Sequence, residues 1–107
     1  MSEGNAPKPI NLLVCQHQFI INPGITIQPN DYARIIDGTL LSALEFQTLD
    51  PIPSGRNLKA ISFLWANGSQ CFASDTLVQN GKATLVLMNA GTNERTITNI
   101  RVLAFWE

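Results

Sequence analysis

The chain has 107 residues, a net charge of −1 and only 14% charged residues, whereas 45% of its residues are hydrophobic. This length suggests one domain with a single core, and the hydrophobic content is too high for a disordered chain. The seven Lys and Arg residues are scattered, which argues against the basic stripe of a nucleic-acid-binding protein.

The chain begins with a polar segment. Residues 1–9, MSEGNAPKP, contain two prolines, and we expect a flexible N-terminal arm before a single β-domain that spans residues 10–107. The apolar stretch at residues 10–14 is too short for a secretory signal. No stretch approaches the roughly 18 apolar residues of a membrane span, so we expect a protein made in the cytoplasm without a membrane partner.

The first half of the domain predicts short strands separated by turns. Strands are expected within residues 10–22, 24–28 and 32–36, with turns at Asn22-Pro23-Gly24, Pro29-Asn30 and Asp37-Gly38. Residues 39–46 fit both a helical stripe and a strand face, and the β-rich surroundings favour a strand. Residues 47–56 contain two prolines and a glycine, which predict a loop.

Asn67-Gly68 lies between two apolar runs, which is the strongest short-range signal of a β-hairpin. A two-residue type I′ turn at this dipeptide assigns a bulky face to the core: Ile61, Phe63, Trp65 and Phe72. The opposite face is smaller but still mostly apolar: Leu58, Ala60, Ser62, Leu64, Cys71 and Ala73. Strands that are apolar on both faces are usually covered on both, and another subunit could supply the second cover.

The last third of the chain has the clearest pattern. Residues 75–79 and 82–89 flank a second turn signal, Asn80-Gly81, and a loop at residues 90–94 leads to a final strand at 95–106. One face of this strand carries Ile100, Val102, Ala104 and Trp106, and the other carries Arg101, Leu103 and Phe105. A tryptophan one residue from the chain end implies that the C-terminus is tied into the sheet or an interface.

These elements predict an all-β fold of about seven to nine short strands: an antiparallel β-sandwich, a jelly roll or a small barrel. The low charge and the doubly apolar strands favour a protein that works in contact with other subunits. The candidate interface residues are Leu58, Ala60, Leu64, Arg101, Leu103, Phe105 and Trp106.

No catalytic motif is present, and we predict neither an enzyme nor a cofactor or metal site. Cys15 and His17 would share a strand face, but the partners of known Cys/His dyads usually come from different elements, so a surface or interface histidine is favoured. Cys15 could bridge Cys71, although two reduced buried thiols are favoured.

Two ligand-related alternatives stay open from the sequence. Carboxylates are spread over separate segments, and a glycosidase pair among them would need a cleft that so small a chain rarely supplies: Asp31, Asp37, Glu45, Asp50 and Asp75. Loop Asn and Asp residues beside exposed aromatics such as Tyr32 or Trp65 could bind sugars, although they are also ordinary turn residues: Asn30, Asp31, Asp50, Asn67, Asp75, Asn80 and Asn93.

The polar arm, the low charge and the strands punctuated by Asn-Gly resemble small β-sandwich virion proteins of tailed bacteriophages, namely capsid decoration (cement) proteins and the heads of tail fibres. The segment at residues 90–93, followed by that at 96–100, has the same character. The resemblance covers residues 10–107 in architecture, and no functional residue is carried over from it.

This resemblance implies a virion protein that forms a dimer or trimer and stabilises the shell by binding a major capsid protein across subunit boundaries. Residues 1–9 would then contact neighbouring shell subunits. The alternative is a carbohydrate- or receptor-binding head of a tail fibre or spike, whose partner would be a glycan.

Overall fold

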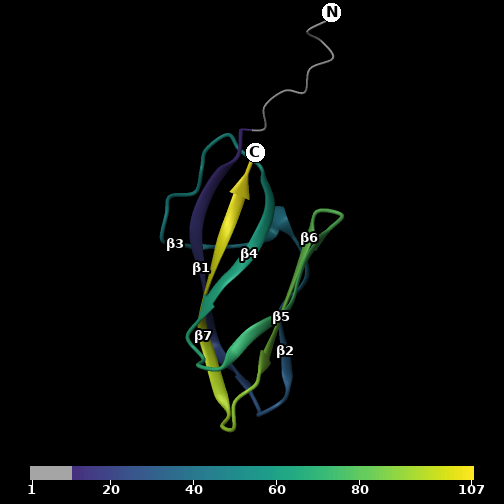
Figure 1. Cartoon of the computed structure of the whole chain (residues 1–107). Helices are drawn as coiled ribbons and strands as arrows, with labels where there is room; N and C mark the ends of the chain where they lie inside the picture. Colours follow the sequence, from purple (N-terminus) through teal and green to yellow (C-terminus); the bar gives the residue numbers. More distant parts are fainter. Residues whose placement is uncertain (1–10) are drawn as a thin grey trace, which may run out of the picture.

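The computed structural model describes residues 11–107, which contain seven β-strands and no α-helix (Figure 1). The strands are β1 (Leu13–Ile27), β2 (Tyr32–Leu40), β3 (Gln47–Thr48), β4 (Leu58–Ala66), β5 (Cys71–Gln79), β6 (Lys82–Asn89) and β7 (Arg95–Trp106). A short 3-10 helix, η2 (Leu41–Ala43), follows β2. The predicted all-β fold is confirmed and β7 has the predicted bounds, whereas β1, with 15 residues, is longer than expected. The predicted arm at residues 1–9 lies outside the described residues.

The strands form two antiparallel sheets that pack as a small sandwich (Figure 1). The order in the four-stranded sheet is β3-β1-β7-β4, and in the three-stranded sheet it is β2-β6-β5. The inner strands β6 and β7 supply half of the residues of the main core cluster: Ala83, Leu85, Leu87, Ile97, Ile100 and Val102 are all fully buried. Every second side chain points inward along β6 and from Ile100 to Trp106 of β7, with a break in this period between Ile97 and Ile100. The faces predicted for the last strand are therefore confirmed from Ile100 to Trp106, and β6 has the same period.

The hairpin predicted at Asn67-Gly68 is wrong. β4 pairs with β7 and β5 pairs with β6, so the chain crosses from one sheet to the other at this point. Neither Asn67 nor Gly68 has a positive φ; the residue that does is Gln70, at 60°. A Cβ at Gly68 would overlap Cδ1 of the fully buried Ile97, so a larger residue here would force that side chain to shift.

The side chain of Asn67 fastens the crossover to β7. Its Oδ1 accepts hydrogen bonds from the backbone N–H of Thr98 at 2.9 Å and of Asn99 at 3.1 Å. Its Nδ2 donates to Thr98 Oγ1 at 3.1 Å. Asn67 was predicted to form a turn through its backbone, but it stabilises the crossover through the hydrogen bonds of its side chain.

The faces predicted for β4 are partly wrong because the strand contains a bulge. Ile61 and Phe63 face the core as predicted, but Leu64 is an extra residue opposite β7. The bulge turns Trp65 outward, where it is exposed.

The face predicted for β5 is reversed. Cys71 and Ala73 pack into the core, whereas Phe72 is 54% exposed. The reversal follows from the missing hairpin, because a strand without a type I′ link to β4 is free to present the opposite parity.

The second turn signal, Asn80-Gly81, forms the predicted hairpin. Its residues have φ of 55° and 71°, and the flanking residues Gln79 and Lys82 are paired, as a two-residue type I′ turn requires.

Other predicted turns are irregularities inside strands. β1 runs through Asn22-Pro23-Gly24 with a register shift between Ile20 and Ile25, and β2 runs through Asp37-Gly38. The strand predicted over residues 39–46 is wrong beyond residue 40, where η2 begins, and the loop predicted at 47–56 contains the two-residue strand β3. The turn at Pro29-Asn30 is confirmed, with a φ of 61° at Asn30.

Candidate functional site

A pocket of about 470 Å³ lies near the C-terminal end of β7, beside η2 and the segment that links η2 to β4. This volume is in the range of small-molecule sites. Its wall is mainly apolar, with a few polar side chains, and its lining residues are Leu41, Ser42, Leu44, Glu45, Phe46, Ile52, Arg56, Asn57, Leu58 and Trp106.

The linking segment is held in place by backbone pairing at both of its ends. β3 pairs with β1, and the backbone N–H of Asp50 donates to Gln16 O at 3.0 Å while the Asp50 carboxylate accepts from the Gln16 N–H at 2.6 Å. At the other end, Asn57 and Glu107 exchange two backbone hydrogen bonds at 2.9 and 3.0 Å. The lining residues between these anchors are therefore fixed by long-range contacts.

A buried aromatic cluster of His17, Phe46 and Trp106 lies against the pocket. The rings of His17 and Phe46 are 4.7 Å apart between centroids, and Trp106 meets His17 edge-on at 5.8 Å. His17 is 0% exposed, so the prediction of a surface or interface histidine is wrong. It lies on the inner side of β1, opposite Val102 of β7, and this pairing buries it.

The hydrogen bond between Trp106 and His17 fixes the proton on the imidazole. The indole Nε1–H of Trp106 donates to His17 Nε2 at 3.2 Å, and an indole can only donate, so the proton of the neutral ring is assigned to Nδ1. Nδ1 makes no hydrogen bond of normal geometry within residues 11–107. Burial lowers the pKa of His17, and the charge and backbone of nearby Asp50 offset this only in part, so the ring is neutral at pH 7.

Cys15 lies on the same inner face, beside Trp106 and Ala104. Burial raises the pKa of its thiol and the carboxylate of Asp50 raises it further, whereas Arg56 acts in the opposite direction. His17 Nε2 is already engaged by Trp106, so Cys15 lacks the features of an activated thiol. Cys15 and Cys71 are both buried and unpaired, as predicted.

The predicted interface residues separate onto two sides of the four-stranded sheet. Four of them lie on the side that faces away from the second sheet, because they alternate along β4 and β7 with residues that face inward: Ala60, Arg101, Leu103 and Phe105. Leu64 is exposed at the bulge. Leu58 and Trp106 lie on the inner side instead, where both line the pocket.

The outer face, as we call this surface, is defined by Val14, Ala60, Trp65, Arg101, Leu103 and Phe105. Val14 and Ala60 flank Phe105 in one cross-strand row, and Val14 is 51% exposed. The guanidinium of Arg101 lies 4.9 Å from the centre of the Trp65 ring, in a cation–π contact.

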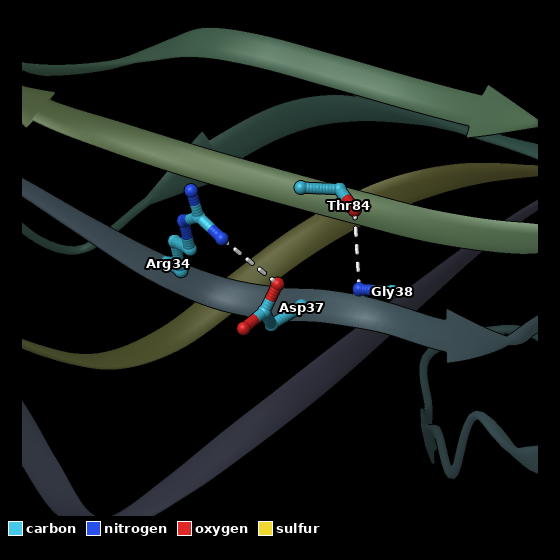
Figure 2. A network of polar contacts seen from close by, with 4 residues as sticks. All are labelled: Arg34, Asp37, Gly38 and Thr84. Carbon is cyan, nitrogen blue, oxygen red and sulfur yellow. Dashed lines mark hydrogen bonds and ion pairs between the residues drawn. The ribbon is translucent and has the colours of Figure 1, made fainter.

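The opposite side of the molecule carries a different row. Tyr32 and Phe72 both pair with Met88 of β6, and they are 56% and 54% exposed. Figure 2 shows polar contacts on these strands: Arg34 and Asp37 form an exposed ion pair at 3.3 Å, and Thr84 Oγ1 accepts from the Gly38 N–H at 3.1 Å.

Several Asn and Asp side chains considered for sugar binding serve the fold instead. Asp31 accepts from the Tyr32 N–H at 2.8 Å, and Asp50 and Asn67 fasten neighbouring strands. Within residues 11–107 no three His, Cys, Asp or Glu side chains are grouped as metal ligands would be. The described part of the chain also contains no helix with the length and apolar character to cross a bilayer.

Comparison of the chain with protein-family models, with curated proteins and with solved structures gave no match.

Sequence reasoning missed the pocket. Its walls come from η2, from the linking segment and from the ends of β4 and β7, which are far apart in the sequence. The apolar residues at positions 40–46 and the terminal tryptophan were the available signals, but neither indicated that the two would meet.

Proposed function

We propose that the protein is a non-enzymatic structural subunit of a virus particle, which docks through the outer face as a capsid decoration protein does. The observation that carries this proposal is the composition of that face. A solvated face of an antiparallel sheet is normally polar, whereas here Phe105 lies in an apolar row between Val14 and Ala60, and Leu103 extends this strip along β7 between Gln16 and Ser62.

One end of the strip has residue types that are enriched at protein interfaces. Trp65 and Arg101 already contact each other, so their side chains are ordered before a partner arrives. Ordered side chains lose less conformational entropy on association, which favours docking. The partner is a second copy of the chain or a neighbouring shell subunit, and the virion assignment rests on the resemblance described above.

The test is the mass of the purified protein by light scattering behind size exclusion. We expect a dimer or trimer, and Leu103→Glu, which places a charge at the centre of the strip, should yield monomers that still fold. Phe72→Glu is the matched control, because it adds the same charge to the other sheet and should leave the assembly intact. A wild-type monomer that also fails to attach to assembled capsid shells would contradict the proposal.

The row of Tyr32, Met88 and Phe72 favours a second candidate, a carbohydrate- or receptor-binding head. The two outer strands of a three-stranded sheet lie roughly 10 Å apart, so Tyr32 and Phe72 present separated aromatic surfaces to a flat or extended ligand. A glycan array tests this candidate. Binding that is lost in Tyr32→Ala and Phe72→Ala but kept in Trp65→Ala would favour it over docking, and an array without hits would count against it.

A further inference from the structure

We propose that the pocket beside η2 and the end of β7 binds a small amphipathic carboxylate, with an aliphatic or aromatic body against the pocket wall and its carboxylate paired with Arg56. None of the residues that define the outer face lines the pocket. The proposal is therefore independent of the docking function.

The wall of the pocket suits an apolar body. Leu41, Leu44, Phe46, Leu58 and Trp106 contribute side chains from η2, the linking segment, β4 and β7. Each methylene of a ligand that is fully removed from water strengthens binding by roughly fourfold. The indole N–H of Trp106 is already bonded to His17, so Trp106 presents an apolar surface and no free donor.

Arg56 is the cation among the lining residues, and it is held in position. Its Nη1 donates to the backbone carbonyl of Asn11 at 3.0 Å. Within residues 11–107 the one ion pair joins Arg34 and Asp37, so no carboxylate of this part of the chain lies within ion-pair distance of Arg56. Within the described part of the chain the other N–H groups of the guanidinium make no hydrogen bond, and their fork matches a carboxylate.

Glu45 also lines the pocket and is exposed. Its carboxylate makes no ion pair with Arg56, so it opposes an anionic ligand without removing the charge that attracts it. The two charges predict opposite effects on affinity. Removing Arg56 must weaken binding of a carboxylate, and removing Glu45 must strengthen it.

The experiment follows the fluorescence of Trp106 in a Trp65→Phe background, so that one tryptophan reports on the pocket. The probes are octanoate and its neutral counterpart octanamide. For octanoate we expect a saturable change with a Kd on the order of 1 mM or tighter, and octanamide should bind at least about tenfold more weakly.

The variants separate the proposed pairing from nonspecific adsorption. Arg56→Gln should weaken octanoate by about tenfold or more and leave octanamide unchanged, and Glu45→Gln should tighten octanoate. Arg34→Gln is the matched control, because it removes an arginine on the other sheet, and circular dichroism establishes that each variant is folded. The proposal is overturned if octanoate gives no saturable change, if octanamide binds equally well, or if Arg56→Gln binds octanoate like the parent protein.

Discussion

The indole of Trp106 donates a hydrogen bond to the imidazole of His17 at 3.2 Å, although 89 residues separate them in the chain. The contact joins the last strand to the first across the β1–β7 pairing and places a polar pair inside an aromatic cluster with Phe46. A buried polar pair is stabilising only while both partners are present, since a lone buried polar atom loses its hydration without replacement. Two predictions follow from this geometry.

Stability should fall on mild acidification because of His17. Its pKa is lowered by burial, so below about pH 6.5 the unfolded chain binds a proton that the folded chain refuses. The free energy of unfolding should therefore decrease as the pH falls from about 7 through the ordinary histidine pKa, and it should level off below the lowered pKa of the folded state.

The measurement for this prediction is urea unfolding over a pH series. His17→Gln keeps an acceptor for Trp106 but cannot titrate, so its unfolding free energy should change less over the same range. The two proteins differ only at position 17, so the difference between the two curves isolates His17. Parallel curves would show that His17 does not have a lowered pKa.

Trp106→Phe should destabilise the fold by about 1–3 kcal/mol. The substitution keeps an aromatic ring but removes the donor to His17 Nε2, which would then be buried without a partner. Trp65→Phe is the control, because that exposed side chain contributes mainly its contact with Arg101, worth about 1 kcal/mol or less. Chemical denaturation followed by circular dichroism measures both, and equal losses would contradict the assigned role of Trp106.

The same substitution should destabilise the protein at one Asn-Gly dipeptide and be tolerated at the other. Asn67→Gly should cost about 1–3 kcal/mol, because it removes the side chain that accepts from Thr98 and Asn99. Asn80→Gly should change stability by less than about 0.5 kcal/mol, because glycine adopts the positive φ of that turn freely. Urea unfolding of the two single variants decides the matter, and a tolerated Asn67→Gly would mean that the side-chain bonds contribute little.

The sequence reliably indicated features that depend on neighbouring residues. Alternating burial in β6 and β7 is a property of a strand with one face against a core, so its period appears directly in residues 82–89 and 100–106. The hairpin at Asn80-Gly81 is equally local, because its two residues supply the backbone angles that the turn needs. The all-β class follows from many such segments together.

Only the tertiary structure decided which strands pair, and the Asn67-Gly68 crossover shows why. The same dipeptide that forms a hairpin at residues 80–81 carries the chain between sheets at residues 67–68, because Asn67 finds its partners on β7 and Gly68 lies against Ile97. Bulges in β1, β2 and β4 also change which side chains face inward. The alternation of apolar and polar residues in the sequence does not show where such an extra residue lies.

The burial of His17 and the pocket beside Trp106 have the same origin. Both depend on residues that are far apart in the sequence and that only the packing of the strands and the linking segment brings together. Their spacing in the sequence does not indicate that they are in contact. The sequence by itself therefore determined the fold class and the strands with a regular period. The strand partners, the inward faces and the candidate sites were decided by long-range contacts, which no local sequence pattern specifies.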